Sequence, residues 1–314
     1  MKKYLKTAIG ILVIALMAAG LMLFRNHQLS DRQILTDDYF KDFDTPYALE
    51  KQYSQMGDHE VSSTTYPSDN SAIGKIHVFY PSELDSSDGV WPMIMIVNPT
   101  DVPAARYQQF FERLASWGFV VVGCDDDDQG TGETASLVLD YMLEESSFGE
   151  RIDRSNIGIA GYSQGGAGAL AAVTMYENGG LYKTIFTGSA VNPQLAASKG
   201  WEYDYTKVAI PYFMTASTGK MDDSGKGEVG EESAGYTPLA SLIEVYDGMS
   251  GNVFKVRGRI AGADHSGMLL LPDGYMTAWM LYQLQGDEEA GKVFLGEDAE
   301  ILQNDHWVDV EKTR

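Results

Sequence analysis

One short stretch constrains this chain more than any other, the pentapeptide Gly161-Tyr162-Ser163-Gln164-Gly165. It follows the apolar run 157–160 and precedes a run of small and apolar residues that reaches Tyr176. A serine between two glycines, after a strand and before a helix, is the context of a G-x-S-x-G nucleophile elbow. A side chain at either flanking position of so strained a turn would collide with the neighbouring strand or helix. This context favours a nucleophile at Ser163 over a chance glycine-rich turn in a chain with 33 glycines.

Strand and helix patterns alternate along the rest of the chain. Two β-rich runs, Val61 to Tyr66 and Ile73 to Tyr80, flank turn residues and predict a hairpin. Further strands are predicted at 93–97, 119–124, 156–160, 208–215 and 252–261, and helices at 105–117, 134–146, 236–249 and 273–284. Alternation at this spacing predicts an α/β fold, with a mostly parallel central sheet flanked by helices.

A nucleophilic serine needs a base and an acid that orients the base. In folds built on this elbow the chain order is serine, acid, histidine, and two histidines follow Ser163. His265 lies in a loop of small residues directly after a predicted strand, where its side chain can reach the carboxyl edge of the sheet. His306 stands beside Trp307 in the tail, with no strand before it. We predict that His265 is the base and that His306 is structural.

The acid is expected after the strand at 208–215. Asp222 and Asp223 are the first aspartates beyond that strand. Adjacent side chains point in different directions, so only one of them can bond the imidazole. We predict Asp222, with Asp223 as the alternative.

Two backbone N–H groups are expected to bind the oxyanion. One belongs to Gln164, at the positive end of the helix that follows the elbow. The second should come from the loop Asn98-Pro99-Thr100-Asp101 after the strand at 93–97. We predict the N–H of Asp101, with Thr100 as the alternative.

Four sequence features, in this order and spacing, carry a resemblance to a known family. They are the segment Ile76 to Pro81 followed by Trp91-Pro92 and a strand, the segment Arg113 to Val121, the elbow segment Gly158 to Gly166, and Gly262-Ala263-Asp264-His265. Residues from about 73 to 285 resemble the α/β-hydrolase superfamily, in its branch of cutinase-like polyester hydrolases and dienelactone-hydrolase-related esterases. The resemblance implies a serine esterase fold with Ser163, His265 and Asp222 or Asp223 as the triad.

The chain also departs from that family. Polyester hydrolases carry a glycine and then an aromatic residue in the oxyanion loop, where Thr100 and Asp101 stand here, and often a methionine in the place of Gln164. The family's substrate-gripping tryptophan would fall near Val191 or Asn192, and its terminal disulfide cannot form because Cys124 is the only cysteine.

The N-terminus has the pattern of an export or membrane segment. Lys2, Lys3 and Lys6 precede an uncharged run from Thr7 to Phe24. This run predicts a signal anchor within residues 1–29, with a cleaved signal peptide as the alternative, and places the rest of the chain outside the cell. Residues 30–58 are polar and predict a tether before a catalytic domain at 59–314.

Charge and cysteine content exclude several classes of partner. The net charge of -22 repels nucleic acid, so no nucleic-acid partner is expected. No zinc-type cysteine spacing is present, and no cofactor or metal is predicted. The acidic run Asp125 to Asp128 could hold Ca²⁺, but a solvated charge run is favoured. Cys124 itself is expected to be a buried apolar residue.

These predictions combine into an extracellular, membrane-tethered serine hydrolase that cleaves a small or polymeric carboxylic ester. One alternative is an acyltransferase or peptidase that acts on a cell-envelope substrate through the same triad. Another is a catalytically silent binding protein, because the carboxylate of Asp101 in the oxyanion loop could oppose a developing negative charge.

Overall fold

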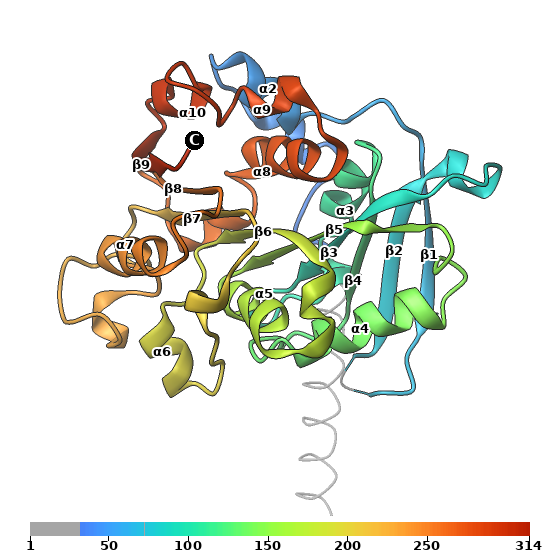
Figure 1. Cartoon of the computed structure of the whole chain (residues 1–314), viewed down its shortest axis with the longest axis horizontal. Coiled ribbons are helices and arrows are strands. Elements are labelled where there is room, and N and C mark those ends of the chain that lie inside the picture. Colours follow the sequence, from blue (N-terminus) through green and yellow to red (C-terminus); the bar gives the residue numbers. More distant parts are fainter. Residues whose placement is uncertain (1–31, 72) are drawn as a thin grey trace, which may run out of the picture.

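A single mostly parallel sheet lies at the centre of the molecule (Figure 1). The structure is a computed structural model that describes residues 32–71 and 73–314. Over these residues the sheet has nine strands in the order β1-β2-β4-β3-β5-β6-β7-β8-β9; the neighbours from β4 to β8 pair in parallel, and β1, β2 and β9 join through antiparallel pairings. The strands are β1 (Val61–Pro67), β2 (Lys75–Pro81), β3 (Trp91–Val97), β4 (Val120–Cys124), β5 (Ile152–Tyr162), β6 (Tyr182–Gly188), β7 (Tyr212–Ser217), β8 (Lys255–Ile260) and β9 (Trp307–Lys312).

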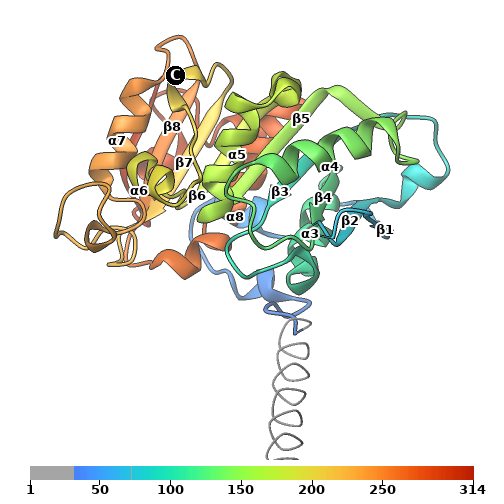
Figure 2. The ribbon, with the colours of Figure 1, turned by 90° about the horizontal axis from the view of Figure 1, so that it is seen from below.

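Helices cover both faces of the sheet, as two views at right angles show (Figures 1 and 2). Along β3 the side chains of Met93, Met95 and Val97 enter the core under α4, α5 and α7, whereas Ile94 and Ile96 enter the core under α3 and α8. This alternation is the two-residue period of a strand that is buried on both faces. The helices are α2 (Ala48–Ser54), α3 (Gln108–Ala115), α4 (Glu133–Glu144), α5 (Gln164–Met175), α6 (Pro193–Ser198), α7 (Leu239–Gly248), α8 (Asp273–Met280), α9 (Glu288–Gly291) and α10 (Glu300–Gln303).

The predicted hairpin, five strands and four helices all have counterparts in the structure, with ends that shift by a few residues. Strand β6 is absent from the sequence-based prediction. Its run Tyr182–Gly188 contains Thr184 and Thr187, which interrupt the apolar pattern although both are buried. The Thr184 hydroxyl accepts from the Trp279 indole at 2.8 Å, and the Thr187 hydroxyl bonds that of Tyr212 at 2.7 Å. Tertiary partners therefore satisfy these hydroxyls, and the segment can lie in the centre of the sheet.

The C-terminal segment after His306 is also a strand rather than a tail. Strand β9 pairs antiparallel with β8, and Trp307 is buried at its start. On the exposed side, Arg259 binds Asp309 at 2.7 Å, and Arg257 binds Glu311. Cross-strand ion pairs of this kind add to an edge pairing that the sequence pattern alone does not reveal.

Residues 32–58, called the strap below, lie within the segment 30–58 predicted as a tether; they contain the short helix α2 and are docked on the rest of the chain. In the first turn of α2 the backbone N–H groups of Leu49 and Glu50 donate to the Glu300 carboxylate at 2.9 and 2.8 Å. The N-terminus of a helix carries a partial positive charge, so it is a favourable place for this carboxylate. The buried Glu50 carboxylate accepts from the Trp307 indole at 2.9 Å, and Tyr53 is buried. The strap is thereby fixed to the C-terminal elements.

The predicted signal anchor, with its apolar run at residues 7–24, lies outside the described residues. Within the described part of the chain, no helix is both long enough and apolar enough to cross a bilayer.

Candidate active site

Ser163 occupies the sharp turn between β5 and α5. Its backbone angles are φ 53° and ψ -119°, a conformation that residues with a side chain rarely adopt. A Cβ atom at Gly161 would lie 2.1 Å from the Gly165 carbonyl oxygen, and one at Gly165 would lie 2.3 Å from the Val97 carbonyl oxygen. Both glycines are therefore required by backbone contacts, and the strained turn holds the serine at the carboxyl edge of the sheet.

The structure brings Ser163, His265 and Asp222 into one hydrogen-bonded row. His265 follows β8 and Asp222 follows β7, so all three residues lie beyond the carboxyl ends of parallel strands. The distance from His265 Nε2 to Ser163 Oγ is 2.8 Å, and that from His265 Nδ1 to Asp222 Oδ1 is 2.6 Å. A carboxylate only accepts hydrogen bonds, so it fixes the imidazole proton on Nδ1 and leaves Nε2 as the acceptor for the serine hydroxyl.

Asp222 is fully buried, and each of its oxygens has partners. Besides the imidazole, it accepts hydrogen bonds from the Ser217 N–H at 2.8 Å, from the Ser217 hydroxyl at 2.6 Å and from the Ser189 hydroxyl. Asp223 instead binds Arg259 at 2.8 Å. The geometry therefore selects Asp222 of the two predicted acids, and it satisfies the buried carboxylate as burial requires.

The other described histidines lie away from this row. His77 is on β2 and bonds Asp125 at 2.8 Å, and His59 bonds Glu83 at 3.0 Å. His306 contacts Tyr47 edge-on, with ring centroids 5.8 Å apart. The ring of His265 instead packs on Tyr236, with centroids 4.7 Å apart. Tyr236 lies just before α7, and its contact with His265 has no signal in the sequence.

The prediction for the second oxyanion donor needs a correction. Asp101 has φ 59°, and this left-handed turn directs its N–H to the Asp127 carbonyl at 3.3 Å. Its alternative, Thr100, lines the cleft beside Ser163, and among the described residues no hydrogen bond engages its N–H. The Gln164 N–H is the first of α5 and has no partner within the helix. The N–H groups of Gln164 and Thr100 thus have no partner among the described residues, and they are the candidate oxyanion donors.

Polar side chains hold the oxyanion loop, residues 98–102, in place. Asn98 is fully buried and donates to the carbonyls of Cys124 and Asp126 at 2.7 and 2.6 Å. The Thr100 hydroxyl donates to Gln164 Oε1 at 3.2 Å, and the amide of that glutamine donates to Asp128. The side chain of Gln164 therefore links the loop to the acidic run.

The acidic run 125–128 is only partly solvated, contrary to the favoured interpretation. Asp126 is buried and accepts from the Asp128 N–H at 2.9 Å and from the Thr134 hydroxyl. Asp127 is exposed; partial burial of its carboxyl, together with the nearby charge of Asp101, raises its pKa above the ordinary value. In the part of the chain that the structure covers, no three acidic, histidine or cysteine side chains cluster as a metal site would require. Cys124 is buried as predicted, and burial raises its pKa to about 12.

A cleft of about 520 Å³ opens over Ser163 and His265. The residues that line it are mostly apolar, and several come from segments that sequence reasoning left out, such as the turn after α6 and the strap. Val191 lines the cleft where the resemblance places a tryptophan, and Trp201 supplies an indole nearby. The lining residues missed by the sequence analysis include Ile34, Lys199, Trp201, Met221, Tyr236 and Leu269.

Part of the chain is similar to known proteins. Residues 47–187 match a family model described as "PETase: PET hydrolase-like". The chain is 32% identical over 130 residues to a bis(hydroxyethyl) terephthalate hydrolase of Streptomyces coelicolor, a match that covers 40% of each chain. It is 39% identical over 67 residues to lipase 1 of a Moraxella species, covering 20% of this chain and 21% of the relative. It is 41% identical over 66 residues to cutinase est1 of Thermobifida alba, covering 19% and 22%. The chain thus spans two fifths or less of the length of these relatives.

Proposed function

We propose that this chain is a PET hydrolase-like, cutinase-related α/β-hydrolase and that it cleaves carboxylic esters through an acyl-enzyme intermediate. The observation that carries the proposal is the row from Ser163 through His265 to Asp222, with bonds of 2.8 and 2.6 Å, at the floor of an open apolar cleft. A serine hydroxyl becomes an activated nucleophile when it is hydrogen-bonded to an imidazole and a buried carboxylate orients that imidazole.

The steps follow from the positions of these atoms. The Ser163 oxygen attacks the ester carbonyl while its proton passes to His265 Nε2, and the Asp222 carboxylate stabilises the imidazolium that forms. The backbone N–H groups of Gln164 and Thr100 bind the tetrahedral oxyanion. When the intermediate collapses, the carbonyl–oxygen bond to the alcohol breaks and Nε2 returns the proton to the leaving alcohol. Water then repeats the sequence on the acyl-enzyme and releases the acid.

The substrates proposed here are neutral esters. The cleft is lined mainly by apolar side chains, and the chain carries a net charge of -22 that disfavours anionic substrates. A location outside the cell, with residues 7–24 as a membrane anchor, is proposed from the lysines and the apolar run of the N-terminus. Membrane fractionation of the full-length chain tests this location; recovery of the whole protein in the cytosol would contradict it.

The catalytic proposal is tested with short p-nitrophenyl esters. We expect Ser163→Ala to lower kcat by about 10⁴-fold or more while the thermal transition is retained. A fluorophosphonate probe should label the wild type at Ser163 and leave the variant unlabelled. Equal ester turnover in the two proteins would refute the proposal, and absence of labelling in the wild type would favour a silent binding protein.

A further inference from the structure

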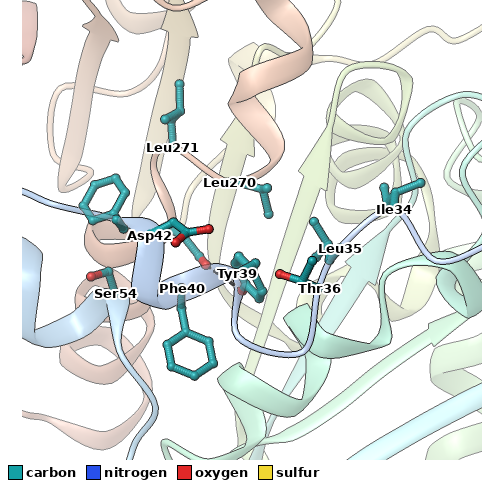
Figure 3. Close-up of a pocket in the computed structure, with 11 residues that line it drawn as sticks. Ile34, Leu35, Thr36, Tyr39, Phe40, Asp42, Ser54, Leu270 and Leu271 are labelled. Carbon is teal, nitrogen blue, oxygen red and sulfur yellow. Dashed lines mark hydrogen bonds between the residues drawn. The ribbon is translucent and has the colours of Figure 1, made fainter.

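A second cavity lies beside the catalytic cleft, between the strap and the segment that follows His265 (Figure 3). Its volume is about 370 Å³. In Figure 3 the strap contributes Leu35, Tyr39 and Phe40, and Leu270 and Leu271 lie across from them. These side chains are half-buried, so their apolar surfaces remain accessible from the cavity. This cavity is called the strap chamber below.

The strap chamber adjoins the catalytic cleft. Ile34 lines both cavities, and its side chain is 41% exposed. On the other wall, Leu269 lines the cleft and the next residue, Leu270, lines the chamber. A group that extends from the cleft past Ile34 therefore passes directly onto the apolar surface of the chamber.

The strap wall of the chamber is fastened at both ends. At one end, Ile34 N–H donates to the Arg106 carbonyl at 2.8 Å, and the Arg106 guanidinium donates to the Arg32 carbonyl at 3.2 Å. At the other, the Tyr39 hydroxyl donates to Asp273 at 2.9 Å and accepts from Arg113 at 3.0 Å. Arg113 and Asp273 form a buried ion pair beneath the wall. Hydrogen bonds and an ion pair thus fix the position of the strap wall of the chamber.

The chemistry of the chamber selects its occupant. The two carboxylates among its lining residues are Asp42, which is exposed at the strap, and Asp273, which Arg113 and Tyr39 already bind. No lysine or arginine side chain lines it, among the residues described, so an anionic group has no partner there. Half-buried leucine and phenylalanine side chains gain free energy when a neutral apolar group covers them.

We propose that the strap chamber is a second substrate site, which binds the neutral alkyl chain of an ester whose carbonyl lies at Ser163. The inference rests on the proposed ester hydrolysis and adds to it a preference for long apolar substrates. Each methylene that leaves water for the chamber should raise kcat/KM by about fourfold. The strap therefore acts as a specificity element, although it lies more than a hundred residues before the elbow in the sequence.

The test compares esters of graded length. For the wild type, kcat/KM should rise from p-nitrophenyl butyrate to p-nitrophenyl decanoate, and a parallel series of alkyl acetates shows whether the acyl or the alcohol chain enters the chamber. Leu35→Asp places a charge in the chamber, and Leu35→Trp fills it with an apolar ring. Both should lower the decanoate-to-butyrate ratio of kcat/KM by tenfold or more. Leu137→Asp, at an exposed leucine on α4, should leave that ratio unchanged.

Two readouts separate this proposal from the proposed function. Thermal melting and fluorophosphonate labelling identify variants that are folded and competent. An unchanged ratio in folded Leu35→Asp and Leu35→Trp would overturn the chamber as a substrate site. If the wild type hydrolyses no ester, the proposed function fails, and calorimetric binding of the neutral alcohol decanol then decides: weakening by tenfold in Leu35→Asp supports the chamber, and equal binding refutes it.

Discussion

The two sides of the candidate site are held in different ways. On the triad side, Gly161 and Gly165 are fixed by backbone atoms about 2 Å from where a Cβ would lie, and Asp222 is fully buried. On the oxyanion side, Thr100 and Asp101 are exposed, and side-chain hydrogen bonds hold the loop. The triad side is close-packed, whereas the oxyanion side is a polar network that runs from the buried Asn98 to the exposed Thr100 and Asp101.

This difference predicts how each side responds to change. A close-packed backbone has no room to relax, so a single added methyl group disturbs the whole turn. Removing one hydrogen bond from a solvent-accessible network costs only about 1 kcal/mol of free energy, because water forms hydrogen bonds with the groups that are left. We therefore expect very large effects on the triad side and graded effects on the oxyanion side. The following predictions run from the largest to the smallest.

Gly165→Ala should have the largest effect. The new Cβ would meet the carbonyl oxygens of Val97 and Asn98 at 2.3 and 2.4 Å, so β3 and α5 must separate. We expect loss of about 3 kcal/mol of unfolding free energy and loss of ester turnover. Urea denaturation measures the first and p-nitrophenyl esters the second. Gly180→Ala is the matched control, because nothing lies within 4 Å of its Cβ; a similar loss there would contradict the steric argument.

Asp222→Asn should lower kcat by about 10³-fold to 10⁴-fold. An amide in place of the carboxylate can no longer stabilise the imidazolium, and it favours the wrong tautomer of His265. The control is the neighbouring Asp223→Asn, which loses the 2.8 Å contact with Arg259 and keeps the triad. Its kcat should stay within a few-fold of the wild type. Steady-state kinetics decide between them, and a reversed ranking would make Asp223 the acid.

Thr100→Val should lower kcat by about fivefold to tenfold. The substitution keeps the backbone N–H of residue 100, the candidate oxyanion donor, and removes the hydroxyl that donates to Gln164 at 3.2 Å, a bond of about 1 kcal/mol. Thr100→Ser restores the hydroxyl and should recover most of the loss. If both variants match the wild type in single-turnover kinetics, the side-chain network does not position the loop.

Asp127→Asn should have the smallest effect, a slight gain in stability that depends on pH. Partial burial and the Asp101 charge raise the pKa of Asp127 in the folded state, so its ionised form costs free energy only in the fold. The cost is present above the folded-state pKa and disappears as the pH falls below the unfolded value of about 3.9. The variant should therefore melt slightly higher than the wild type at neutral pH and equally at about pH 3. A gain that persists at low pH would contradict this cause.

Sequence reasoning worked best where one residue type has one structural meaning. The glycines around Ser163 mark the turn because only glycine fits there, and the small-residue loop around His265 follows its strand in the sequence. It failed where a segment depends on distant partners. Strand β6 needs Trp279 and Tyr212 to satisfy its buried threonines, and the strap needs Glu300 and Trp307 to hold α2.

The oxyanion loop shows which features can be predicted from sequence and which require the tertiary structure. The sequence places Thr100 and Asp101 after a buried strand, but backbone N–H groups leave no trace in residue type. The left-handed turn at Asp101 and the bond of its N–H to the Asp127 carbonyl from another loop engage this donor, and they leave the Thr100 N–H as the candidate.

The sequence by itself determined the α/β alternation and the sharp turn at Ser163, and it led to His265 as the proposed base and to a choice between two adjacent acids, because local sterics and chain order specify them. Only the tertiary structure placed Asp222 rather than Asp223 against His265, engaged the Asp101 N–H with the Asp127 carbonyl and brought the strap beside the cleft. These features depend on contacts between residues far apart in the chain, and their geometry exists only once the sheet has assembled.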